Sequence, residues 1–210
     1  MTMEYLNSLN EPQRQAVTYS DGPSLVIAGA GSGKTRVLTY KIAYLLQSGL
    51  KPQSILALTF TKKAATEMKD RIAKVVGTEA ASKLWMGTFH AIFARILRAE
   101  AEKLGLDKDF TIYDGTDSQN LLATIIKERK LDDKTYNAKK IHARISRLKN
   151  DLVTPQMYRD IPEFHERDLA DHLYAFGDLY AAYAARCKNA NALDFDDILL
   201  FTNILLRDDP

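Results

Sequence analysis

A glycine-rich segment that ends in Lys-Thr constrains the fold of this chain more than any other feature. Residues 26–38 read VIAGAGSGKTRVL, an apolar run followed by three spaced glycines and then Lys34 and Thr35. Residues 28–35 have the spacing of a P-loop, with Ala28 where glycine is more usual. Because a P-loop joins a strand to a helix, we expect an α/β fold built on a parallel sheet.

The residue types of this segment suit phosphate groups. Glycines let backbone N–H groups turn toward phosphate oxygens, since no Cβ is in the way, and the following helix adds the positive end of its dipole. The Lys34 ammonium is expected to reach the β- and γ-phosphates of ATP, and the Thr35 hydroxyl to ligate Mg²⁺; both are predicted to be catalytic. The residues of the segment predicted to bind the nucleotide are Ala28, Gly29, Ala30, Gly31, Ser32, Gly33, Lys34 and Thr35.

Short apolar runs alternate with helical patterns in the first part of the chain. Each run is followed by apolar residues at helical spacing. Such alternation favours a parallel sheet with helices on both faces. The predicted buried strands are residues 24–29, 54–60 and 84–89, with residues 110–113 as a fourth candidate.

The pattern becomes helical near Asp114. No convincing strand is found from there to about Asn191, and apolar residues from Leu169 to Cys187 predict one long helix. We therefore expect an all-helical subdomain inserted into the α/β domain. The predicted division is 1–113 for the first part of the α/β domain, 114–191 for the insertion and 192–210 for the return to the α/β domain.

Four further motifs accompany the P-loop in a fixed order. Upstream, LNEPQRQAV carries Asn10 and, three residues later, Gln13, which is the pattern of a capping box at a helix start. Downstream lie LTFTKKAATEM at 58–68, GTFHA at 87–91 and LDFDDIL at 193–199. Together these motifs resemble those of the UvrD/Rep-like superfamily 1 DNA helicases.

The resemblance implies a RecA-like fold and a motor that hydrolyses ATP with Mg²⁺. Such a motor moves 3′ to 5′ on single-stranded DNA and unwinds duplex DNA, in repair or replication. The resemblance also implies that Gln13 hydrogen-bonds the adenine edge and that Arg36 lies against the adenine face. The residues implied to contact single-stranded DNA are Thr59, Phe60, Thr61, Lys63, Thr88, His90 and Phe195.

Three aromatic and basic positions near these motifs allow more than one interpretation. Lys62 stands where the family commonly has asparagine, and an ammonium cannot replace the paired donor and acceptor of an amide. Phe60 is expected to offer a stacking face to DNA bases, with core packing as the alternative. Phe89 is expected to be core, because it continues an apolar helical stripe.

Basic residues concentrate in one segment, although the net charge is only +2. Residues 127–149 hold nine Lys or Arg and three Asp or Glu, a local charge of +6. Lys140, Arg144 and Arg147 share one face of a helix predicted to start after Asn137. Two interpretations stay open, a solvated face or a contact with DNA phosphates.

The sequence offers no acidic partner for the P-loop. A P-loop motor needs a hydrophobic strand that ends in Asp to hold Mg²⁺, and LDFDD is expected to lack a preceding strand. Asp194 is better explained as a helix N-cap than as a metal ligand with Asp196 and Asp197. We therefore expect residues 1–210 to be a truncated piece, inactive alone, that ends before the acidic strand and a second RecA-like domain.

Composition limits the remaining classes. The single cysteine, Cys187, excludes an internal disulfide and a cysteine-built metal site. The N-terminus has no signal-peptide pattern, and no apolar run reaches the roughly 20 residues that span a bilayer, so a cytoplasmic protein without membrane contact is expected. The rival functions are a helicase–nuclease subunit, a P-loop small-molecule kinase, which leaves TFTKKAA and GTFHA unexplained, and a non-catalytic DNA-binding module.

Overall fold

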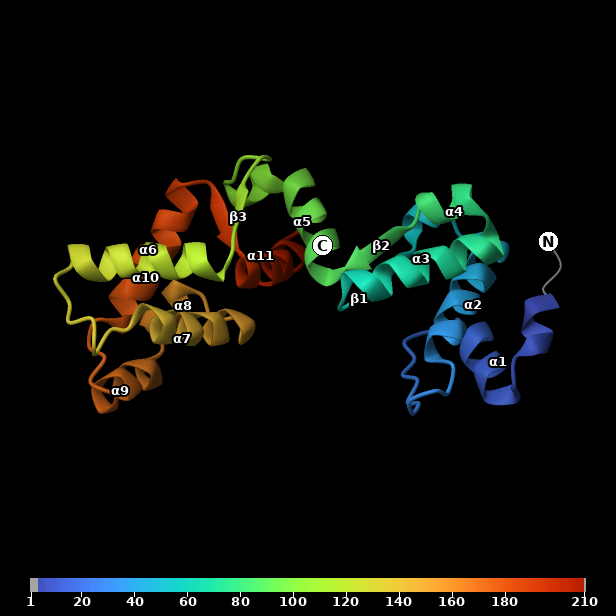
Figure 1. The fold of residues 1–210 in the computed structure, drawn as a ribbon, viewed down its shortest axis with the longest axis horizontal. Coiled ribbons are helices and arrows are strands. Elements are labelled where there is room, and N and C mark those ends of the chain that lie inside the picture. Colours follow the sequence, from blue (N-terminus) through green and yellow to red (C-terminus); the bar gives the residue numbers. More distant parts are fainter. Residues whose placement is uncertain (1–3, 210) are drawn as a thin grey trace. The chain divides into compact units, whose positions relative to one another are not determined.

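A computed structural model describes residues 4–209 of the chain (Figure 1). The chain divides into two compact units between Ile92 and Phe93. The division falls within helix α5 (Phe89–Ala99), and each unit has its own hydrophobic core. The chain thus contains two separately packed bodies.

The first unit is mainly helical. It contains α-helices, two short 3-10 helices and two short strands. In chain order, the elements before α5 are η1 (Glu4–Ser8), α1 (Glu11–Thr18), α2 (Lys34–Gln47), η2 (Pro52–Ser54), β1 (Leu56–Thr59), α3 (Lys62–Val76), α4 (Thr78–Ser82) and β2 (Trp85–Thr88).

The two strands of the first unit form a parallel sheet. Their register runs from Leu56 opposite Trp85 to Thr59 opposite Thr88. They confirm the strands predicted at 54–60 and 84–89, with each strand shorter at both ends. Helix α3 packs on both strands, and α2 packs on α3. The core between them contains Ile42, Ile55, Ala57, Met68, Ile72, Ala81 and Leu84.

Residues 24–29 form no strand, so that prediction is wrong. The segment is irregular, and Leu25 and Ile27 are 85% and 90% exposed. An apolar run becomes a buried strand only where a neighbouring strand takes its N–H and C=O groups. Within residues 4–92, β1 and β2 pair only with each other. The run has no partner strand there, which periodicity along the sequence does not report.

The second unit combines a helical bundle with a second pair of strands. The strands lie far apart in the sequence, with helices between them. After α5, the elements are η3 (Ala101–Leu104), β3 (Thr111–Tyr113), α6 (Gly115–Glu128), α7 (Ala138–Asn150), α8 (Pro155–Asp160), α9 (Pro162–Ala170), α10 (Phe176–Asn189), β4 (Ala192–Asp194) and α11 (Phe195–Asp208).

Strands β3 and β4 pair in parallel, from Thr111 opposite Ala192 to Tyr113 opposite Asp194. Strand β3 confirms the fourth strand candidate. The expectation that LDFDD lacks a preceding strand is wrong, because β4 is short but fully buried. The sequence did not predict β4 because the strand has only three residues, fewer than are needed to recognise the alternating pattern of a strand. The pairing brings the start of α6 close to the start of α11.

The apolar pattern from Leu169 to Cys187 is divided between α9 and α10, so the prediction of one helix is wrong. Helix α9 ends in a Schellman motif, in which the N–H of His172 donates to the Leu169 carbonyl and the N–H of Leu173 donates to the Asp168 carbonyl. His172 has a φ of 56°, a left-handed conformation that glycine usually supplies. The helix end therefore carries no glycine signal.

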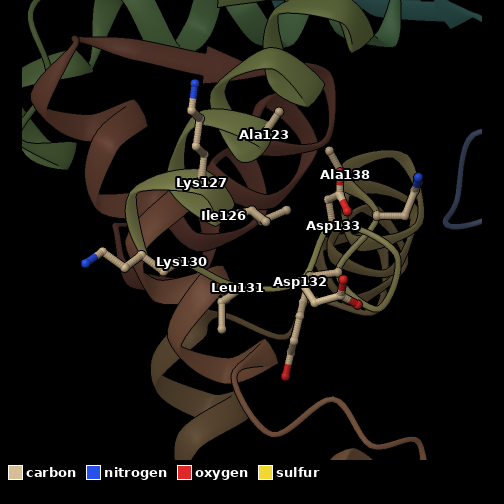
Figure 2. Close-up of a pocket in the computed structure, with 10 residues that line it drawn as sticks. Ala123, Ile126, Lys127, Lys130, Leu131, Asp132, Asp133 and Ala138 are labelled. Carbon is tan, nitrogen blue, oxygen red and sulfur yellow. The ribbon is translucent and has the colours of Figure 1, made fainter.

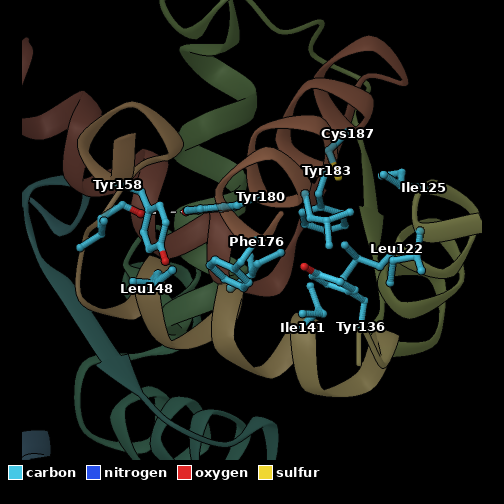
Figure 3. Packing of buried hydrophobic residues seen from close by; sticks show 14 residues of the cluster. Leu122, Ile125, Tyr136, Ile141, Leu148, Tyr158, Phe176, Tyr180, Tyr183 and Cys187 are labelled. Atoms are coloured by element: carbon cyan, nitrogen blue, oxygen red, sulfur yellow. Dashed lines mark hydrogen bonds between the residues drawn. The ribbon is translucent and has the colours of Figure 1, made fainter. Parts of the chain in front are cut away.

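Aromatic side chains fill the core of the helical bundle (Figure 3). Tyr158, Phe176 and Tyr180 are buried, and the ring of Tyr158 lies against the rings of the other two. Their polar ends are satisfied, since the Tyr180 hydroxyl donates to the Val153 carbonyl at 2.7 Å and the Tyr158 hydroxyl donates to Asp168 at 2.8 Å. The bundle is thus held by large, satisfied aromatics.

Candidate nucleotide and DNA-binding site

The P-loop leads directly into α2, whose first residue is Lys34. Gly31 and Gly33 have φ values of 76° and 86°, which glycine adopts without strain. A Cβ on Gly33 would also lie 3.0 Å from Nε2 of Gln13, whereas a Cβ on Gly31 would meet no atom within 4 Å. Glycine is therefore favoured at position 33 by the backbone conformation, and a Cβ there would also displace the end of the Gln13 side chain. The space beside Gly31 fits a phosphate group approaching the loop.

Lys34 lies within the loop that it is predicted to serve. Its ammonium donates to the carbonyls of Ala28 at 2.9 Å and Gly29 at 2.6 Å. The Ser32 hydroxyl closes the loop by donating to the Gly29 carbonyl at 2.8 Å. To bind a phosphate, the ammonium would have to exchange these two carbonyls for phosphate oxygens. An ammonium group, a glycine turn and a helix N-terminus together suit a nucleotide phosphate chain.

Thr35 occupies the first turn of α2. It is exposed, and its carbonyl accepts a hydrogen bond from the buried Thr39 hydroxyl at 2.9 Å. The hydroxyl of Thr35 therefore stands on a fixed piece of backbone at the helix start. A single hydroxyl at this position fits the part of one Mg²⁺ ligand, with phosphate and water oxygens as the others.

Gln13 has the capping role that the sequence suggested and a second contact, with the P-loop. Its side chain completes a confirmed capping box, accepting from the Asn10 N–H at 3.2 Å while Asn10 accepts from the Gln13 N–H at 3.0 Å. Its Nε2 also donates to the Ser32 carbonyl at 3.0 Å. One amide thus connects the start of α1 to the P-loop, which places it beside the predicted nucleotide.

A basic cleft of about 390 Å³ lies beside Arg36, between α2 and α3. Arg36 sits over the ring of Tyr40, 5.5 Å from its centroid. Arg71 and Lys74 of α3 line the same cleft. Sequence reasoning missed both, although their spacing of three residues places them on one helix face. They add positive charge next to the predicted adenine contact.

The predicted DNA contacts of the first unit gather at the carboxyl ends of β1 and β2. Thr59 and Thr88 are paired residues at those ends. Phe60 follows β1 and is 88% exposed. Core packing is therefore wrong for Phe60. Phe89 is only partly buried, and its ring lies 5.3 Å from that of Phe60 at 35°, so the expectation that it is core holds only in part.

Two of the predicted DNA contacts also begin helices. The Thr61 hydroxyl caps α3 by accepting from the Ala64 N–H at 3.1 Å, and the Thr88 hydroxyl accepts from the Ala91 N–H at 3.3 Å. Lys62 and Lys63 are exposed in the first turn of α3. His90 lies in the first turn of α5. The structure thus brings these residues to one end of the small sheet.

Phe195 lies in the second unit, where it begins α11 and is 53% exposed. The N-cap prediction for Asp194 is confirmed, because its carboxylate accepts from the Asp197 N–H at 2.8 Å in a capping box. Among residues 4–209, no group of His, Cys, Asp and Glu side chains has the arrangement of a metal site. Asp194 and Asp197 of the LDFDD motif thus form the cap of α11.

From the sequence, Lys149 was only one charge of the basic segment 127–149, and its burial was not predicted. It is 2% exposed, and its ammonium lies 2.7 Å from carboxylates of both Asp194 and Asp197. Burial raises the pKa of Asp197 to about 6. Burial would lower the pKa of Lys149, but the two carboxylates outweigh it and hold that pKa above its ordinary value. The buried lysine is therefore charged at neutral pH.

The predicted basic face is divided by the structure. Arg144 is 18% exposed; it donates to Asp168 at 2.7 Å and lies 4.2 Å over the Phe176 ring. The interpretation as a DNA phosphate contact is thus wrong for Arg144, because its donors are engaged inside the bundle. Lys140 and Arg147, on the same helix, are exposed. Only these two remain candidates for phosphate contact.

The second unit also has an open pocket of about 710 Å³ where α6 leads toward α7. Figure 2 shows Lys127 and Lys130 extending from the end of α6, with Asp132 and Asp133 on the connecting loop. Both charge signs therefore line its rim. None of the residues predicted to bind nucleotide or DNA lies in it.

No helix within residues 4–209 has the length and apolar character of a membrane span.

Comparisons with known proteins identify relatives of this chain. Over 199 residues the chain is 41% identical to the ATP-dependent DNA helicases PcrA of Staphylococcus aureus and Staphylococcus epidermidis, which covers 94% of this chain and 26% of each relative. The chain thus spans about a quarter of the length of these relatives. Residues 9–210 match the UvrD/REP helicase N-terminal domain, and the chain belongs to that family.

Proposed function

We propose that the full-length protein is an ATP-dependent DNA helicase. The observation that carries the proposal is the exposed Phe60 at the carboxyl end of β1, in the same unit as a P-loop. A folded domain gains nothing from leaving a phenylalanine 88% exposed, whereas an exposed ring at this edge offers a stacking face to any base. Two relatives that are named as ATP-dependent DNA helicases support the same function.

Nucleotide binding is assigned to the P-loop, residues 28–35, together with Gln13 and Arg36. Lys34 neutralises the phosphates after leaving the loop carbonyls, and Thr35 ligates Mg²⁺. Gln13 meets the adenine edge through its amide, and Arg36 stacks on the adenine face. ATP bound there with Mg²⁺ would supply the free energy for movement, through cleavage by water of the bond between its β- and γ-phosphates.

DNA binding is assigned to the carboxyl ends of the strands and to the start of α11. Phe60 and Phe195 contact bases, and the hydroxyls and basic groups of the two threonine-containing motifs contact the backbone. The proposed set is Thr59, Phe60, Thr61, Lys63, Thr88, His90 and Phe195. Single-stranded DNA is the track and duplex DNA the substrate that is unwound.

The domain organisation that fits this function is a RecA-like domain with a helical insertion. Residues 1–113 and 192–210 belong to the RecA-like domain, and residues 114–191 form the insertion. Pairing of β3 with β4 supports these boundaries, since it brings both ends of the insertion together. We propose movement in the 3′ to 5′ direction, a cytoplasmic location, and a role in repair or replication.

The test compares ATP hydrolysis by the full-length protein with and without single-stranded DNA. Stimulation by DNA is expected for wild type, and Lys34→Ala should abolish turnover while the circular dichroism spectrum is retained. Residues 1–210 expressed alone should bind single-stranded DNA and show no helicase-level hydrolysis. ATP turnover that does not respond to DNA and that transfers the γ-phosphoryl group to a small molecule would identify a kinase and refute the helicase.

A further inference from the structure

A buried basic residue at the end of α7 is bonded to the start of α11. The Lys149 ammonium lies 2.7 Å from Oδ2 of Asp194 and 2.7 Å from Oδ1 of Asp197. The Tyr183 hydroxyl donates to the same Asp194 oxygen at 2.8 Å. One lysine, itself 2% exposed, thus joins two carboxylates that lie on the same side of the first turn of α11.

The next residue of α7 holds the third carboxylate of the same turn. Nδ2 of Asn150 donates to Oδ1 of Asp196 at 2.9 Å. Two adjacent residues at the end of α7 therefore hold Asp194, Asp196 and Asp197. Phe195 lies between Asp194 and Asp196 in the sequence. It is 53% exposed at the surface of this turn.

Stability alone does not account for this arrangement. Burying an ion pair costs desolvation that the Coulomb attraction barely offsets, and apolar residues of the same size usually do as well or better. Asp194 needs no lysine to cap α11, because the capping box with Asp197 already satisfies its backbone partners. What the ionic contacts add is a defined orientation, since charge-assisted hydrogen bonds are directional.

We propose that Lys149 and Asn150 are positioning residues, which fix the first turn of α11 so that Phe195 is presented to single-stranded DNA. The inference rests on the proposed function, in which Phe195 contacts bases. It also couples α7, with its exposed Lys140 and Arg147, to that contact through one rigid connection.

The test uses the full-length protein and a charge-free version of the cluster. Lys149→Met alone would leave two buried carboxylates without a counter-ion and is expected to unfold the unit. The triple variant Lys149→Met/Asp194→Asn/Asp197→Asn keeps the side-chain volumes. It also keeps the capping box of α11, since asparagine caps helices as well as aspartate does. Asn150→Ala removes the surface contact only.

The triple variant is expected to raise the Kd for single-stranded DNA by roughly 3- to 10-fold. The DNA concentration that half-saturates ATP hydrolysis should rise by the same factor, while kcat at saturating DNA is retained. Phe195→Ala alone should weaken binding by roughly 5-fold or more. In the Phe195→Ala background, the triple variant should have no further effect, because positioning acts only through that ring.

The matched control is Arg144→Met/Asp168→Asn, which neutralises another interior ion pair of the same unit. It should leave the Kd for DNA unchanged, and its melting temperature reports how much an interior ion pair contributes to stability. If the losses of DNA affinity in the triple variant and in Phe195→Ala add up when the two are combined, Lys149 is a structural residue and the inference is overturned. An unchanged DNA affinity in Phe195→Ala would overturn it as well, while DNA-stimulated hydrolysis by wild type would leave the proposed helicase standing. No stimulation in wild type would remove both.

Discussion

Replacing Gln13 with glutamate separates two roles that meet on one side chain. Glutamate at this position of a capping box still accepts from the Asn10 N–H, but it cannot donate to the Ser32 carbonyl or to a base. The lost hydrogen bond to Ser32 should lower the free energy of unfolding by about 0.5–1.5 kcal/mol. Any further change should be less than about 0.5 kcal/mol, because the capping box is kept. Base recognition should be lost, because adenine offers one donor and one acceptor that only an amide pairs with.

The magnitude follows from the bonds that the amide makes. Two lost hydrogen bonds to adenine would cost about 1–3 kcal/mol, or roughly 5- to 150-fold. Because Gln13 is only half-buried, we expect the low end, about tenfold in the preference for ATP over GTP. The added negative charge weakens both nucleotides equally, so the ratio isolates base recognition.

The assay measures kcat/KM for ATP and for GTP at saturating single-stranded DNA, together with thermal unfolding. Asn10→Ala is the matched control, since it removes the N-cap bond at a cost of about 0.5–2 kcal/mol and leaves the Gln13 contact with Ser32. Its nucleotide preference should equal that of wild type. An unchanged ATP-to-GTP ratio in both Gln13→Glu and Gln13→Ala would refute adenine recognition and leave Gln13 with structural contacts alone, to Asn10 and Ser32.

Three further predictions follow from exposure, pairing and titration. Phe60→Ala should cost about 1–3 kcal/mol of single-strand affinity with little change in melting temperature; a large fall in melting temperature at unchanged affinity would contradict this. Neutralising Lys140 and Arg147 should flatten the log Kd against log[salt] slope by up to about 0.7 per contact on single strands, whereas Arg144→Met should leave the slope unchanged. Because the folded pKa of Asp197 is raised to about 6, folded protein binds a proton that unfolded chain releases, so its contribution to stability is lost as pH rises from about 4 to 6. Thermal unfolding of Asp197→Asn between about pH 4 and pH 6 should lack this loss of stability. Identical dependence of the melting temperature on pH in wild type and Asp197→Asn would contradict the prediction.

Local chemistry was readable from the sequence alone. Glycine at position 33, the capping box of Asn10 and the N-cap of Asp194 depend on residues a few positions apart. Their determinants are backbone sterics and short-range hydrogen bonds, which the order of residues specifies directly. The start of α7 after Asn137 was predictable for the same reason.

Tertiary structure decided every question that depended on a distant partner. Residues 24–29 have strand composition but no neighbouring strand in their unit. The same helix carries exposed Lys140, half-buried Arg144 and buried Lys149, and only partners 24 and 45 residues away, Asp168 and Asp194, distinguish them. Burial and pairing arise when segments far apart in the chain meet, and the charge of a side chain does not state whether a carboxylate or water will meet it.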